Sequence, residues 1–98
     1  MEAVFGLLKK LFAGGGAAAV HTAQPVHCGD YTITPVPRKE ANGWRVEGLI
    51  SRHIDGEHKE FRFVRADVYF SIDDTVSATV QKAERIIKEQ GDRMFESP

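Results

Sequence analysis

The dipeptide Asp55-Gly56, with alternating apolar and polar residues on both sides, constrains the fold of this chain more than any other feature. Both central residues of a type I′ turn need a positive φ, and Asp-Gly suits that need. The pattern therefore predicts a long antiparallel hairpin over residues 44–54 and 57–66. From the turn outward, the predicted pairs are Ile54 with Glu57, Arg52 with Lys59, Ile50 with Phe61, Gly48 with Phe63, and Val46 with Arg65.

This register gives the hairpin one apolar face and one polar face. A shift of one residue would turn the aromatic side chains into water, so the register is well specified. The apolar face holds Trp44, Val46, Ile50, Phe61 and Phe63. The polar face holds Arg45, Glu47, Ser51, His53, His58, Glu60 and Arg62.

Signals for further elements lie on both sides of the hairpin. Residues 31–37 alternate like a strand, and we expect an edge strand because Pro35 and Pro37 have no N–H to donate. Asn42-Gly43 marks the turn into the hairpin. Ser71, followed by two aspartates, is a helix N-cap, and Gly91 is typical of a helix end. The helical face predicted to be buried comprises Val76, Thr79, Val80, Ala83, Ile87 and Gln90.

Together these elements predict an α+β domain over residues 30–98. A three-stranded antiparallel meander is followed by one C-terminal helix packed on its apolar face (β-β-β-α), and Met94 or Phe95 folds back on the core. Residues 1–29 are interpreted as an apolar N-terminal segment and a flexible Gly/Ala linker. With 98 residues, 42% of them hydrophobic, the chain has room for one small core.

The composition argues against several classes of protein. A net charge of −1 gives no global attraction to nucleic acid or anionic lipid. Cys28 is the single cysteine and cannot form an internal disulfide. No run approaches the roughly 20 apolar residues of a membrane-spanning helix. We therefore expect a cytoplasmic protein.

No catalytic, cofactor-binding or metal-binding constellation stands out. His53 and His58 face each other across the hairpin, but a structural zinc site takes four ligands and no third is fixed nearby. Cys28 lacks the positioned base and the oxyanion site that a nucleophile needs. The sequence thus predicts a non-enzymatic protein with no cofactor, metal or small-molecule substrate.

Arg45 and Arg62 are the candidate residues for a nucleic-acid contact on the polar face of the sheet. The charge there is interrupted by Glu47 and Glu60, and the aromatic residues that would stack on bases face the helix. A solvated face is therefore the preferred interpretation. Nucleic-acid binding by this face is the alternative.

The other candidates for a partner contact are Leu49, Val64, Ile86 and Asp67. The first three are apolar and have no burial partner in the predicted arrangement, so they are candidates for a dimer or protein contact. Asp67 ends the hairpin. There, hydrogen bonds to backbone amides or a pair with Arg65 are favoured over a ligand contact.

Residues 1–12 place Val4, Leu8 and Leu11 along one helical side next to Lys9 and Lys10. Such a segment suits a groove on a partner protein or the surface of a membrane. A disordered tail is the alternative interpretation.

A set of short motifs is spread over nearly the whole chain. It comprises Tyr31-x-Ile33-x-Pro35, Trp44-x-Val46-x-Gly48-x-Ile50, Ile54-Asp55-Gly56-Glu57, Phe63-Val64-Arg65-Ala66-Asp67, Lys82-Ala83-x-x-Ile86-Ile87 and Glu89-Gln90-Gly91-Asp92-Arg93-Met94-Phe95. This pattern resembles the small bacterial HlyU family. The resemblance implies a link to transcriptional regulation, and it implies no particular catalytic or DNA-reading residue.

Two hypotheses of function follow. The first is a bacterial regulatory or adaptor domain that contacts another protein, in part through residues 1–12. The second is direct nucleic-acid binding through the sheet face that carries Arg45 and Arg62. A helix-turn-helix needs at least two helices, and the domain is expected to contain one. The sequence therefore favours the first hypothesis.

Overall fold

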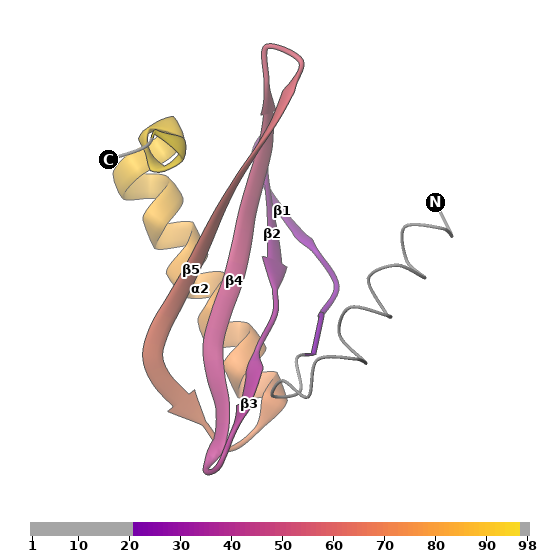
Figure 1. Cartoon of the computed structure of the whole chain (residues 1–98), viewed down its shortest axis with the longest axis vertical. Helices are drawn as coiled ribbons and strands as arrows, with labels where there is room; N and C mark the ends of the chain where they lie inside the picture. The colour runs from indigo at the N-terminus through magenta and orange to yellow at the C-terminus, as the bar shows by residue number, and fades with distance from the viewer. Residues whose placement is uncertain (1–20, 97–98) are drawn as a thin grey trace.

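The hairpin predicted around Asp55-Gly56 is the centre of the structure (Figure 1). In the computed structural model, which describes residues 21–96, strands β4 (Gly43–Ile54) and β5 (Glu57–Tyr69) pair antiparallel on either side of this turn. Asp55 and Gly56 have φ angles of 53° and 79°, as a type I′ turn requires. The predicted pairs from Ile54–Glu57 to Gly48–Phe63 are all present.

Beyond Glu47 the register changes, and the predicted pairing of Val46 with Arg65 is wrong. Glu47 pairs with Val64, but Arg45 pairs with Val68 instead of Ala66. The extra residues of β5 form a bulge, which extends the strand past its predicted end to Tyr69 and accompanies a pronounced bend (Figure 1). The stretch 65–68 (Arg-Ala-Asp-Val) continues to alternate between polar and apolar residues, so its sequence gives no signal for this shift.

Three short strands complete the sheet, where the sequence predicted one. β2 (Tyr31–Pro35) and β3 (Arg38–Glu40) follow the same edge of β4 in one continuous register. β1 (Val26–Cys28), which lies in the segment interpreted as linker, pairs with β2. The predicted α+β class is confirmed, and β4 is the central strand with β5 on its other side.

The predicted edge position of β2 is wrong, because β1 and the residues before it cover its second side. The main-chain N–H groups of His21 and Ala23 donate to the carbonyls of Pro37 and Pro35, at 3.0 Å each. In an antiparallel pair a residue directs its N–H and C=O toward the same neighbour. The missing proline N–H groups therefore face the irregular residues 21–25, and the ladder with β4 loses no donor.

Helix α2 (Ile72–Gln90) begins and ends at the predicted residues. Ser71 caps its N-terminus by accepting a hydrogen bond from the N–H of Asp74 at 3.2 Å. Gly91 follows the helix with a φ of 55°.

The buried face of α2 is rotated from the predicted one and comprises Thr75, Thr79, Ala83 and Ile86. The hydroxyls of Thr75 and Thr79 donate to main-chain carbonyls one turn earlier, at 2.8 and 2.7 Å, so these polar residues can be buried. Thr79 and Ala83 belong to both faces, but the prediction left out Thr75 and Ile86 and so misplaced the face. Ile86 is a core residue, and its interpretation as a candidate contact residue is wrong.

The core lies between α2 and the face of the sheet that we call the inner face. The short 3₁₀ helix η1 (Gly91–Phe95) closes it, because Met94 is buried there and Phe95 stacks on Tyr31, as expected for this segment. Asp92 fixes η1 by accepting hydrogen bonds from Tyr31 at 2.6 Å and from Arg52 at 2.8 Å. The buried apolar residues are Ile33, Val46, Ile50, Phe63, Ala83, Ile86 and Met94.

Gly48 permits the close approach of α2 to the sheet. A Cβ atom at this position would lie 2.8 Å from both the Phe63 ring and the Thr79 methyl group. We expect Gly48→Ala to lower the free energy of unfolding by about 1–3 kcal/mol, the usual range for overpacking. Urea denaturation measures this change. Ser77→Ala, on the exposed side of α2, is the control and should be nearly neutral; equal losses would contradict the close packing at Gly48.

Candidate interaction surface

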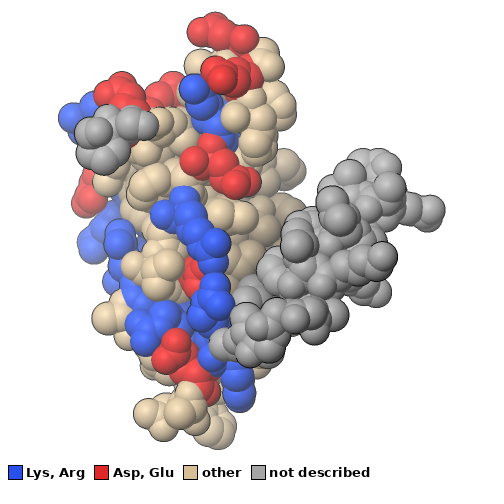
Figure 2. Space-filling view, in the orientation of Figure 1, with Lys and Arg blue, Asp and Glu red and all other residues tan. Residues whose placement is uncertain are grey.

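The face of the sheet opposite α2 carries most of the candidate residues. In Figure 1 the helix lies behind the strands, and Figure 2 shows from the same side that Lys and Arg gather over the sheet with acidic residues among them. We call this surface the outer face. By strand alternation and pairing it includes Arg38, Glu40, Arg45, Glu47, Leu49, Glu60, Arg62, Val64 and Val68.

Glu47 is buried at the centre of the outer face and binds two arginines. Its side chain is 2% exposed. Arg38 Nε donates to Glu47 Oε1 at 2.9 Å, and Arg62 Nε donates to Oε2 at 2.7 Å. Burial alone raises the pKa of Glu47, but the hydrogen bonds and charges of Arg38 and Arg62 outweigh it and hold the pKa below its usual range. The carboxylate is therefore ionised and neutralises part of the positive charge of the face.

Arg45 forms a second ion pair on the same face. Its Nε and Nη2 donate to the two carboxylate oxygens of Glu40, at 2.8 and 3.1 Å, and its Nη1 donates to the carbonyl of Arg65 at 3.2 Å. The hydrogen bond from Arg45 is the main reason that the pKa of Glu40 is lowered. Both candidate arginines, Arg45 and Arg62, are thus held by carboxylates.

Sequence reasoning missed the role of Arg38 and Glu40. These residues lie between the predicted strand 31–37 and the turn at Asn42-Gly43, and no strand was predicted there. In the structure β3 lies beside the start of β4, where Arg38 pairs with Arg45 and Glu40 with Gly43. The available signal is the two-residue turn Ala41-Asn42. Extending that hairpin backward in register places Arg38 close to Glu47.

The apolar candidates of the outer face have different exposures. Val64 is 48% exposed and Val68, which pairs with Arg45, is 37% exposed. Leu49 is half-buried between neighbouring strands.

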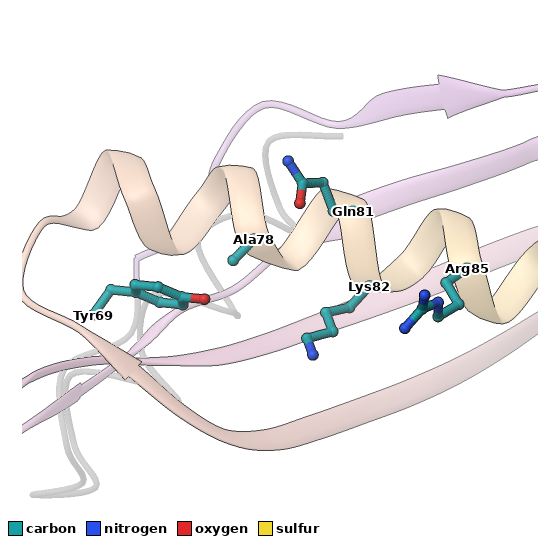
Figure 3. A pocket seen from close by; sticks show the side chains of 5 residues that line it. All are labelled: Tyr69, Ala78, Gln81, Lys82 and Arg85. Carbon is teal, nitrogen blue, oxygen red and sulfur yellow. The ribbon is translucent and has the colours of Figure 1, made fainter.

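Asp67 contacts the helix instead of the turn. Its Oδ2 lies 3.3 Å from Lys82 Nζ, and no ion pair with Arg65 forms among the described residues. Nearby, a shallow hollow of about 320 Å³ opens between the end of β5 and α2 (Figure 3). It is lined by Tyr69, Ala78, Gln81, Lys82 and Arg85. The cations here have acidic neighbours, since Lys82 pairs with Asp67 and Arg85 lies 3.9 Å from Glu89.

His53 and His58 meet at the turn end of the hairpin, as the register predicts. Their ring centroids lie 5.1 Å apart, in an edge-to-face arrangement. Within residues 21–96 no group of three or more His, Cys, Asp or Glu residues is arranged to hold a metal ion. None of the helices in this part of the chain is long and apolar enough to cross a membrane.

Fold and surface together define a small α+β domain with arginine–glutamate pairs on an open sheet face. A family model described as "Transcriptional activator HlyU" matches residues 6–95. The chain belongs to this family of transcriptional regulators, as the sequence resemblance implied. Comparisons with curated proteins and with solved structures give no match.

Proposed function

We propose that this chain is a non-enzymatic regulatory domain of the bacterial cytoplasm that acts by binding another protein, in the manner of an adaptor. The observation that carries the proposal is the pairing of the arginines on the outer face. Phosphate contacts dominate the affinity of proteins for nucleic acid. The positive charge of an arginine held by Glu40 or Glu47 is partly neutralised by that carboxylate, which weakens its attraction for a phosphate, so this face is poorly suited to nucleic acid.

The single long helix supports the same proposal. The described residues contain no second helix that could pack beside α2 in a helix-turn-helix, and the buried face of α2 is used against the sheet. The aromatic rings of Phe61 and Phe63 are on the inner face, so they are not available to stack on RNA bases. Transcriptional regulation would then operate through a protein partner.

A binding titration separates this proposal from direct nucleic-acid recognition. We expect no saturable change in fluorescence anisotropy when labelled fragments of host DNA or RNA are titrated with the full chain at physiological salt. Binding that falls steeply with salt, and that weakens in Arg62→Ala but not in the helix variant Arg85→Ala, would establish the nucleic-acid alternative. Both arginines are largely exposed, so the two variants are matched.

Crosslinked capture from the host tests the protein contact directly. The eluate is divided for mass spectrometry and DNA sequencing. We expect a defined protein without enriched DNA, and we expect a chain that lacks residues 1–12 to lose that protein. The predicted apolar segment over these residues lies outside the described part of the structure. Capture that survives the deletion would remove residues 1–12 from the contact, and enriched promoter fragments would contradict the adaptor role.

A membrane-surface contact would appear as binding of the full chain to anionic vesicles.

A further inference from the structure

Strand β5 has one unpaired edge. It pairs with β4 alone, and among the described residues no main-chain hydrogen bond outside that ladder involves it. A long strand with a row of free N–H and C=O groups is a template for another strand. β5 extends over Glu57–Tyr69, and its pairing with β4 is regular from Glu57 to Val64, where the bulge follows.

The hairpin determines which residues offer their main-chain groups to this edge. The Asp55-Gly56 loop has two residues, so the flanking residues Ile54 and Glu57 exchange hydrogen bonds. Every second residue of β5 from Glu57 onward therefore faces β4. The alternate residues direct their N–H and C=O groups to the free edge, and they are His58, Glu60, Arg62 and Val64.

We propose that a second copy of this chain pairs antiparallel with the free edge of β5, about a two-fold axis at Phe61. In this register the residues with free main-chain groups face one another, as a hydrogen-bonded ladder requires. Arg62 lies opposite the partner's Glu60. His58 lies opposite the partner's Val64, and Phe61 lies opposite the partner's Phe61. The two sheets become one continuous sheet.

Charge complementarity favours this register over those with the two-fold axis at a nearby residue of β5. An axis at Lys59, Glu60 or Arg62 would place that residue opposite its own copy, and like charges directly opposite are destabilising. An axis at Phe63 would pair Arg62 with valine and Glu60 with alanine, so the ion pairs of both residues would be lost. The axis at Phe61 places Glu60 and Arg62 of each strand opposite the partner's Arg62 and Glu60, and it places no like charges opposite each other.

The side chains on this edge are available for such contacts. Arg62 is 56% exposed, and only its Nε and Nη2 bind Glu47, so Nη1 is without a partner among the described residues. The carboxylate of Glu60 is half exposed, with His58 Nε2 at 3.7 Å. Phe61 is partly buried against the core, so a pair of Phe61 rings would extend the two cores toward each other.

The molar mass of the full chain in solution tests the dimer. Sedimentation equilibrium should give the mass of two chains, falling to that of one chain on dilution. Glu60→Lys places a cation opposite the partner's Arg62 and should shift the equilibrium to the monomer. Glu84→Lys makes the same charge change on the exposed side of α2 and should leave the dimer intact. A chain that remains monomeric at all concentrations, or a dimer that Glu60→Lys does not weaken, would overturn the proposal.

A disulfide test fixes the register. In a Cys28→Ser background, Phe61→Cys places two thiols across the axis in a non-hydrogen-bonded pair, where Cα atoms lie about 4.5 Å apart, within disulfide range. We expect an intermolecular disulfide under mild oxidation. Lys59→Cys is the control, because its copies lie well apart in this register. Circular dichroism verifies that both variants fold. A crosslink in the Lys59→Cys variant and none in the Phe61→Cys variant would contradict the register, and the proposed protein-binding function does not depend on either outcome.

Discussion

Phe63→Ala is expected to lower the free energy of unfolding by about 3–5 kcal/mol, which threatens the fold of so small a domain. The ring is 3% exposed and packs in the core beneath Gly48 and Thr79. Removing it takes away apolar burial and leaves a cavity that the flanking strand and helix cannot fill completely. Urea denaturation followed by circular dichroism measures the change.

Phe70 provides a matched control for this variant. It follows β5 directly and is 92% exposed, so Phe70→Ala should be nearly neutral. Arg62→Ala should also cost little, because Arg62 is more than half exposed and Arg38 remains bound to Glu47. Equal losses in Phe63→Ala and Phe70→Ala would mean that the hairpin register, and with it the inner face, is wrong.

Glu47→Gln is expected to cost about 1–3 kcal/mol at pH 7, because two arginines lose the charge that they hydrogen-bond. The cost should depend on pH. The folded-state pKa of Glu47 lies below its ordinary value of 4.5, so the ionised carboxylate stabilises the fold above pH 4.5. This contribution is lost as the pH falls through 4.5 toward the folded-state pKa. The stability difference between the two proteins should therefore shrink in acid.

Denaturation curves at pH 7 and at pH 3.5 measure this difference. Glu84→Gln is the control, since Glu84 is exposed on α2 and lies away from the sheet. Its effect should be small at both pH values. A Glu47→Gln difference that is equal at the two pH values would show that the Glu47 charge does not stabilise the fold.

Local sequence signals predicted the hairpin and the helix well. Asp55-Gly56 set the register up to Gly48 and Phe63, because turn geometry and alternation act over neighbouring residues. Ser71 and Gly91 set the bounds of α2 for the same reason. The bulge after Val64, the strands β1 and β3, and the rotated face of α2 were not predicted. The bulge and the rotated helical face depend on contacts between residues distant in the sequence, whereas β1 and β3 pair across short local turns that the prediction overlooked.

The candidate surface was predicted in part. Alternation placed Arg45, Arg62 and Val64 on the outer face, as in the structure. The ion pairs were missed because the pairing of β3 with β4 was not predicted, and Arg38 reaches Glu47 only when these strands lie side by side. Ile86 was misassigned because the predicted helical face, which includes Val76, Val80 and Ile87, is rotated from the face that the sheet buries.

The sequence by itself determined the central hairpin, the ends of the helix and the family to which the chain belongs, since these depend on local backbone preferences and short motifs. The tertiary structure decided which charged residues of the sheet are buried and which of them form ion pairs. Glu47 looked like a solvated residue on a polar face, yet packing buries it between Arg38 and Arg62. Burying an unpaired carboxylate costs free energy because the charge loses its hydration. The ion pairs with the two arginines offset that cost. That pairing is the physical reason that the positive charge of this arginine-rich face is partly neutralised.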